Sequence, residues 1–88
     1  PISAIDVATV INMNPSAFSR FFKRIHRKNF TTYLNEIRIG YACKLLIEGK
    51  QKVISICYDS GFNNISNFNR QFKKIKKMTP TEFVHLYT

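Results

Sequence analysis

Apolar residues between Phe30 and Glu48 recur at helical spacing and fall into two stripes. The first stripe, spaced at i, i+3, i+4 and i+7, consists of Phe30, Tyr33, Leu34, Ile37, Tyr41 and Leu45. The second stripe lies on the opposite side, mainly in the C-terminal half, and consists of Ile39, Ala42, Cys43, Leu46 and Ile47. Because a surface helix usually has a single apolar stripe, the pattern predicts a central helix over residues 30–48 with one compact unit packed on each stripe.

The segments on either side of this helix repeat each other. Residues 15–25 read PSAFSRFFKRI, and residues 65–75 read ISNFNRQFKKI. At an offset of 50 positions the identical pairs are Ser16/Ser66, Phe18/Phe68, Arg20/Arg70, Phe22/Phe72, Lys23/Lys73 and Ile25/Ile75. Two copies indicate two similar units joined by a helix, since a solenoid needs more repeats.

A short apolar segment precedes each repeat. Residues 3–11 and residues 53–60 have the spacing of short helices, and a tight turn follows each of them. Gly61 provides the second turn, and Phe62 is expected to fill the core behind it. Two helices joined by a tight turn form a helix-turn-helix, so the chain is expected to contain two of these motifs.

Capping residues predict where the repeated helices begin. Asn14 is a typical N-cap for a helix over residues 15–26, and Asn63 or Asn64 is typical for a helix over about residues 64–76. Their buried face is expected to consist of Phe18, Phe21, Phe22, Ile25, Phe68, Phe72 and Ile75.

The C-terminal segment predicts a last helix. Thr79 is suited to its N-cap, Pro80 to its first position and Glu82 to its first turn. This helix is expected to bury Phe83 and Leu86.

These elements define an all-α fold in three parts, and no segment shows the alternation of a strand. Residues 1–29 form the first helix-turn-helix subdomain, residues 30–48 form the linker helix, and residues 49–88 form the second subdomain.

The charge of the chain indicates a polyanionic partner. Its 88 residues include 14 Lys and Arg against 5 Asp and Glu, a net charge of +9. Such a balance favours nucleic acid or an anionic membrane surface. No run of about 18 apolar residues is present, so we expect no membrane span. A cationic module that binds RNA or a membrane surface remains the alternative to a module that binds DNA.

The sequence offers little for catalysis or metal binding. Cys43 and Cys57 lie in apolar patterns typical of buried free thiols, which suggests a reducing compartment. The acids have no His, Cys or carboxylate partner at a useful spacing, so we expect no enzyme activity, no metal site and no cofactor. An enzyme such as a DNA-repair methyltransferase would need one of these cysteines to be accessible and reactive.

The solvent face of each repeated helix is suited to DNA. Opposite the apolar face, the repeats carry Ser16, Ser19, Arg20, Lys23 and Arg27, and then Ser66, Asn69, Arg70, Lys73 and Lys77, with Asn67 beside them. The first turns are polar and the later turns are basic, as expected of a helix whose N-terminal turns meet base edges while its C-terminal end lies near phosphates.

Direct contacts follow from the chemistry of the base edges. Arg20 and Arg70 match the acceptors of guanine, Asn67 or Asn69 matches adenine, and Ile65 at an exposed first position matches a thymine methyl group. Solvated surface charge, or arginines that brace the turn or bind phosphate, remain as alternatives.

At this point the sequence resembles the DNA-binding domain of the AraC/XylS family of bacterial transcription regulators. The resemblance rests on YLNEIRIGYACKLL in the central helix, ISICYDSGFNNISNFNRQFKK in the second unit, the closing TPTEF, and PISAIDVATVINMNPSAFSRFFK in the first unit. It implies two helix-turn-helix subdomains, homeodomain-like and bridged by a long helix, whose second helices enter the major groove.

The resemblance also implies functional positions. The predicted base contacts are Pro15, Ser16, Ser19, Arg20, Ile65, Ser66, Asn67, Asn69 and Arg70. The predicted phosphate contacts are Asn14, Lys23, Arg27, Asn64, Lys73, Lys77 and Thr79.

Two features depart from the family pattern. The glycine usual after each recognition helix is absent, and Arg27/Lys28 and Lys77 stand there instead. Cys57 and Ser60 occupy positions that are usually alanine or small and apolar. Family members also place a helix before PIS, so we expect the chain to be a fragment.

The resemblance implies partners as well. We expect double-stranded DNA, RNA polymerase, and an N-terminal effector or dimerisation domain in the full-length protein, and no membrane. The expected location is the cytoplasm, at the bacterial nucleoid.

Overall fold

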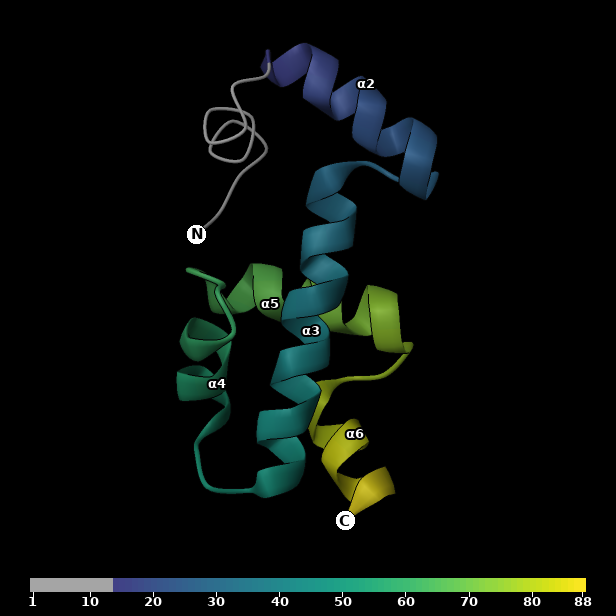
Figure 1. The fold of residues 1–88 in the computed structure, drawn as a ribbon. Helices are drawn as coiled ribbons and strands as arrows, with labels where there is room; N and C mark the ends of the chain where they lie inside the picture. Colours follow the sequence, from purple (N-terminus) through teal and green to yellow (C-terminus); the bar gives the residue numbers. More distant parts are fainter. Residues whose placement is uncertain (1–13) are drawn as a thin grey trace. The chain divides into compact units, whose positions relative to one another are not determined.

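The structure, a computed structural model, describes residues 14–88. Within this range the chain forms only helices and no strand, as expected of an all-α fold (Figure 1). The helices are α2 (Pro15–His26), α3 (Phe30–Glu48), α4 (Val53–Asp59), α5 (Ile65–Lys76) and α6 (Pro80–Tyr87). The helix expected over residues 3–11 lies outside the described residues.

The central helix α3 has the predicted bounds. Its end is marked by Gly49, which has a φ of 69° and whose N–H donates to the Leu45 carbonyl over 3.2 Å. This left-handed conformation strains residues that carry a Cβ atom, so glycine suits the position. The chain divides within α3 into two compact units, Pro1–Asn35 and Glu36–Thr88, and each is described by itself.

The core of the second unit consists of side chains from α3, α4, α5 and α6 and from the turn between α4 and α5. Figure 1 shows the last three helices around the C-terminal half of α3. The buried residues of this core are Ile39, Ala42, Cys43, Leu45, Leu46, Ile56, Cys57, Phe62, Phe68, Phe72 and Phe83. Phe62 follows the turn at Gly61 and packs edge-on against Phe68 with 5.4 Å between ring centroids, which confirms that it fills the core.

The described core of the first unit is an aromatic cluster. Phe18 and Phe22 of α2 are buried against Phe30 and Tyr33 of α3. The Phe22 ring lies 5.1 Å from Phe30 and 5.2 Å from Tyr33, both in the edge-on geometry that aromatic rings favour. His26 stacks on Phe22 at 4.2 Å and extends this cluster to the end of α2.

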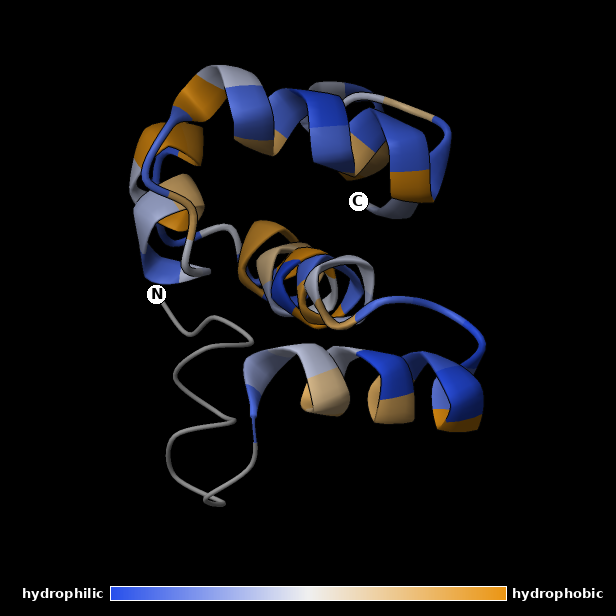
Figure 2. Cartoon of the chain, turned by 90° about the horizontal axis from the view of Figure 1, so that it is seen from above, coloured by the Kyte–Doolittle hydropathy of each residue, from blue (hydrophilic) through white to orange (hydrophobic). Residues whose placement is uncertain are grey.

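The predicted burial of Phe21 and Ile25 on α2 is wrong. Phe21 is 44% exposed and Ile25 is 58% exposed, because the described aromatic cluster gathers around Phe18 and Phe22 instead. Phe21 contacts the guanidinium of Arg24 at 6.0 Å from its ring centroid. Figure 2 shows hydrophobic and hydrophilic segments alternating along α2, the helix that begins where the grey trace ends.

The first predicted stripe of α3 is also interrupted. Ile37 and Tyr41 are exposed, whereas Leu45, assigned to the same stripe, is buried in the second unit. Of the second stripe, Ile47 is exposed. Helical spacing therefore predicted most of the α3 side chains that are buried in the second unit. It overestimated how many residues of the first stripe are buried.

The last helix is fixed by a capping box. The Thr79 hydroxyl accepts the Glu82 N–H over 3.1 Å, and the Glu82 carboxylate accepts the Thr79 N–H over 2.8 Å. These bonds hold the pKa of Glu82 below its usual value, because they favour the ionised carboxylate. Phe83 is buried as predicted, but Leu86 is 63% exposed, so its predicted burial is wrong.

The two residues that depart from the family pattern, Cys57 on α4 and its C-cap Ser60, are both buried. Cys57 is a free thiol, as is Cys43, and burial raises the pKa of both. The Ser60 hydroxyl donates to the Ile56 and Cys57 carbonyls at 2.7 and 3.1 Å, so its burial leaves no polar atom unsatisfied. A buried thiol with a raised pKa lacks the thiolate character that nucleophilic cysteines need.

Candidate nucleic-acid interface

The repeated helices α2 and α5 begin in the same way. The Asn14 side chain accepts the N–H groups of Ser16 and Ala17 at 2.9 and 3.3 Å. Fifty positions later, the Asn64 side chain accepts the Asn67 N–H at 2.9 Å. Asparagine oxygens satisfy donors that have no partner within the helix, so both helices start at predicted positions.

They also end in the same way. Arg27 and Lys77 have φ angles of 59° and 64°, and each N–H donates to the carbonyl four residues earlier, at 2.7 and 2.8 Å. Both residues therefore take the left-handed conformation in which glycine is usual. Both positions carry a cationic side chain although the backbone conformation favours glycine, which indicates that the positive charge has a function there.

We expect Lys77→Gly to stabilise the protein and weaken its DNA binding. Glycine removes the strain of the left-handed conformation, but it also raises the conformational entropy of the unfolded chain. The net effect should add about 0.5–1 kcal/mol to the free energy of unfolding. Urea denaturation measures this change. Lys76→Gly removes the same charge from the last residue of α5, where glycine should instead destabilise by about 0.5–1 kcal/mol. Equal effects of the two variants on stability would contradict this account.

The predicted contact residues of α2 reach solvent. Pro15, Ser16, Arg20 and Lys23 are exposed, and Ser19 is half-buried. Asn14 and Arg27 are exposed at the two ends of the helix. The first unit therefore presents a polar start and a basic end on one helix.

The predicted contact residues of α5 are arranged similarly, with one correction. Ser66, Asn69 and Arg70 are exposed and Asn67 is half-buried, whereas Ile65 is half-buried against the core of the second unit rather than fully exposed. The Arg70 Nη2 group donates to the Asn67 Oδ1 atom over 2.7 Å. The Asn67 oxygen is thus engaged within the helix, and its amino group remains as a donor.

Three of the predicted phosphate contacts are caps. Asn14, Asn64 and Thr79 use side-chain oxygens to accept N–H groups at the starts of α2, α5 and α6. Each of these side chains has hydrogens that can still donate to a phosphate. The predicted phosphate contacts Lys73 and Lys77 are exposed.

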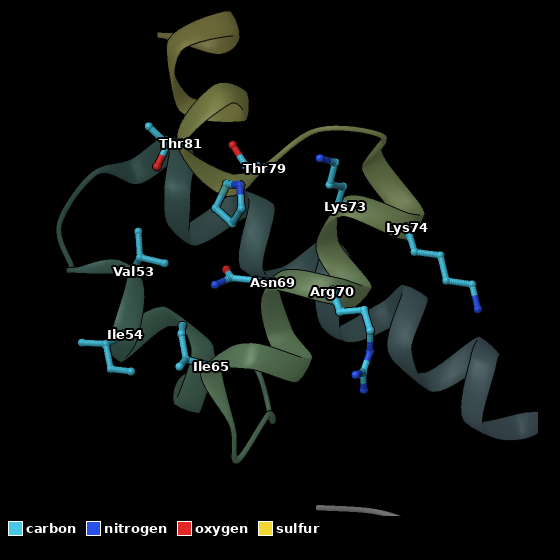
Figure 3. A pocket seen from close by; sticks show the side chains of 10 residues that line it. Val53, Ile54, Ile65, Asn69, Arg70, Lys73, Lys74, Thr79 and Thr81 are labelled. Carbon is cyan, nitrogen blue, oxygen red and sulfur yellow. The ribbon is translucent and has the colours of Figure 1, made fainter.

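A hollow of about 920 Å³ lies beside α5 in the second unit. Figure 3 shows Val53, Ile54 and Ile65 on one side of it and the cations Arg70, Lys73 and Lys74 on the other. Asn69, Thr79, Pro80 and Thr81 complete the lining. The hollow joins an apolar surface to a basic rim, which suits a sugar–phosphate strand.

Sequence reasoning missed five residues of this hollow. The residues that line it without having been predicted to contact DNA are Val53, Ile54, Lys74, Pro80 and Thr81. For Lys74 a signal existed, because it stands four residues after Arg70 and such residues are neighbours on a helix surface. For the other four, a place in the lining depends on how α4 and α6 pack around α5.

Two other kinds of site, a metal site and a membrane span, find no support in the described residues. Among them, no group of three or more His, Cys, Asp and Glu side chains could hold a metal ion. No helix in the described part of the chain is long and apolar enough to span a membrane.

Comparisons with known proteins agree with this geometry. Residues 7–85 match the family described as "Helix-turn-helix domain". The chain is 35% identical over 86 residues to the "Transcriptional activator RhrA" of Rhizobium meliloti, which covers 96% of this chain and 27% of that protein. The chain spans between 21% and 31% of the length of such curated relatives.

Solved structures have the same fold. "The C-terminal domain of AraT, a response regulator" from Geobacillus stearothermophilus matches with a TM-score of 0.91 and 25% identity, covering 97% of this chain and 70% of that one. A protein of unknown function from Listeria innocua matches with a TM-score of 0.94 and 27% identity, covering 100% of this chain and 84% of that one. The match to AraC-type domains confirms the predicted fold class.

The family consists of non-enzymatic DNA-binding domains of transcription regulators, in agreement with the absence of a predicted catalytic site. Paired caps, basic helix ends and sequence match all lead to one assignment. The chain belongs to the helix-turn-helix family as an AraC-type DNA-binding domain of bacterial transcription regulators.

Proposed function

We propose that the chain binds double-stranded DNA sequence-specifically by inserting α2 and α5 into successive segments of the major groove. The observation that carries this proposal is the shared design of the two helices. Each has an asparagine cap, polar first turns, a basic last turn and a cation in the left-handed position after the helix. A recognition helix uses its N-terminal residues for base edges and nearby cations for phosphates.

The proposed base contacts lie in the first turns. Arg20 and Arg70 would donate to the O6 and N7 atoms of guanine, and Asn69 has the amide that pairs with adenine. The remaining base contacts are proposed at Pro15, Ser16, Ser19, Ile65 and Ser66. Asn67, predicted from the sequence as a further base contact, has its side-chain oxygen engaged by Arg70. Ile65, although half-buried, lines the hollow with one side and would meet a thymine methyl group there.

The proposed phosphate contacts surround these residues. Lys23, Arg27, Lys73 and Lys77 provide charge, and the capping residues Asn14, Asn64 and Thr79 provide neutral donors. Because the chain has a net charge of +9, release of counterions from DNA should supply much of the affinity.

One molecule would read an asymmetric site without dimerising, since both helices belong to one chain. Successive major-groove segments lie about 34 Å apart. If the two helices cannot reach that spacing on straight DNA, the duplex must bend, at about 1–6 kcal/mol for 40° or more, or one helix must remain outside the groove.

The wider context of the chain is also a proposal. The curated relatives are three to five times longer, so we propose that the full-length protein adds an effector or dimerisation domain. One relative is named a transcriptional activator, and we propose that this domain likewise works next to RNA polymerase, at the nucleoid in the cytoplasm.

The proposal is tested by comparing Arg70→Ala with Lys73→Ala. A base contact should cost about 1–3 kcal/mol and relax one base position, whereas a phosphate contact should weaken all sequences alike. The measurement is selection of duplex sites from random DNA, followed by affinities for the selected and for random duplexes. A two-box consensus about ten base pairs apart is expected for the unmodified chain.

Two results would contradict this proposal. Equal losses for Arg70→Ala on selected and random DNA would remove Arg70 from the base contacts. Binding to anionic liposomes that survives excess duplex DNA would favour a membrane-surface module instead of a DNA reader.

A further inference from the structure

A hydrogen bond on α5 fixes the side chain of Arg70. Its Nη2 group donates to the Asn67 Oδ1 atom over 2.7 Å, and the Gln71 Nε2 group reaches the same oxygen at 3.4 Å. Residues three apart are neighbours on a helix surface, so the bond forms within one turn. The guanidinium therefore has a defined position on α5 before DNA binds.

The first repeat lacks this arrangement. At the offset of 50 positions, Arg20 corresponds to Arg70 and Ala17 corresponds to Asn67. The backbone is matched, because the Ala17 N–H donates to the Asn14 cap as the Asn67 N–H donates to the Asn64 cap. A methyl group accepts no hydrogen bond, so Ala17 cannot hold Arg20 as Asn67 holds Arg70.

We infer that Asn67 is a positioning residue that sharpens base discrimination by Arg70, and that α5 therefore reads its bases more strictly than α2. The inference rests on the proposed function. It deepens that function by assigning different contributions to base discrimination to the two repeated helices.

The bond leaves Arg70 able to read guanine. A guanidinium presents two pairs of parallel N–H groups, one formed by Nε and Nη2 and the other by Nη1 and Nη2. Nη2 has two hydrogens, one in each pair, so a single bond to Asn67 occupies one pair and leaves the other. The remaining pair is enough for the bidentate contact with O6 and N7.

Holding the Arg70 side chain in place is expected to change base discrimination because it reduces the conformational freedom of that side chain. A free arginine side chain loses rotamer freedom on forming a bidentate contact, and it can move to a nearby phosphate when the base is wrong. A fixed guanidinium has less freedom to lose on the correct base and fewer ways to adapt to a wrong one. We expect the difference to be about 2- to 10-fold in the preference for the correct base.

The first test is Asn67→Ala in the 88-residue chain, alone and combined with Arg70→Ala. The probe is a duplex library randomised over about two helical turns, and the readout is the preference at each base position. Asn67→Ala should reduce the preference about 2- to 10-fold at the position that Arg70→Ala also relaxes, and it should add nothing to Arg70→Ala. Superimposable melting curves exclude a folding defect.

The double variant separates positioning from direct reading. If Asn67 reads a base itself, its alanine variant will relax a second position and will do so in the Arg70→Ala background as well. That result would overturn the inference and leave the proposed DNA-binding function intact.

Two further variants use the repeat as a control. Asn67→Asp keeps an acceptor for Arg70, so the preference should be retained even though the added negative charge weakens binding to all duplexes. Ala17→Asn gives α2 the missing acceptor and should raise the preference at the position read by Arg20. No change with Ala17→Asn would overturn the proposed difference between the helices.

Failure of the inference differs from failure of the function. If the unmodified chain selects no consensus, the proposed function fails. If it selects a consensus that Arg70→Ala relaxes and Asn67→Ala leaves unchanged, only the role of Asn67 fails.

Discussion

Replacement of Phe68 by alanine is expected to unfold the second unit. Phe68 is fully buried and packs against Phe62 and Phe72, with ring centroids 5.4 and 5.9 Å away. Loss of a buried phenylalanine costs about 3–5 kcal/mol, because transfer energy is lost and a cavity remains. A core of this size supplies about 3–5 kcal/mol in total, so little stability should be left.

Tyr58→Ala is the matched control, since it removes an exposed aromatic ring from the same unit. Tyr58 is 55% exposed on α4, and its replacement should change the free energy of unfolding by less than about 1 kcal/mol. Urea denaturation followed by circular dichroism measures both variants. A Phe68→Ala variant that unfolds at the same urea concentration as the unmodified chain would show that this core does not depend on its central ring.

The helix bounds could be predicted because short-range chemistry determines them. Asn14 and Asn64 accept N–H groups at the helix starts, and Thr79 and Glu82 cap each other at the start of α6. These bonds join residues two or three positions apart, so the sequence already contains both partners. The match between α2 and α5 follows from the repeat for the same reason.

Burial was harder to predict because it depends on partners far away in the sequence. Phe21 and Ile25 follow the same helical spacing as Phe18 and Phe22, but the described cluster with Phe30 and Tyr33 includes only the latter pair. On α3, Leu45 was assigned to the first stripe and instead packs in the core of the second unit. Periodicity identifies which face of a helix is apolar, but it does not identify the element that packs against that face.

The candidate site shows the same limit. The cations of α5 and Asn69 were predicted from their spacing and are exposed as expected, whereas Asn67 is half-buried. The bond from Arg70 to Asn67 was not predicted, since residue spacing permits it and only the side-chain rotamers decide it. The half-burial of Ile65 likewise follows from its contact with the core rather than from its place at the helix start.

The affinity for DNA is expected to fall steeply with salt. If both helices engage, roughly 6–10 phosphate contacts form, and affinity should fall about 10³-fold or more between 50 and 200 mM monovalent salt. If only one helix engages, three or four contacts would give a fall of about 40- to 150-fold. Fluorescence anisotropy on a selected duplex, repeated across this range, distinguishes the two modes.

Paired variants then show which helix contributes. Lys23→Ala with Arg27→Ala removes two proposed phosphate contacts beside α2, and Lys73→Ala with Lys77→Ala removes the corresponding two beside α5. Each pair should reduce the salt slope by about 1.8 if its helix lies in the groove. A slope that changes only with the α5 pair would mean that α2 remains outside the groove. The free energy needed to bend the DNA would then exceed the binding free energy that the contacts of α2 supply. A slope unchanged by both pairs would mean that other cations neutralise the phosphates.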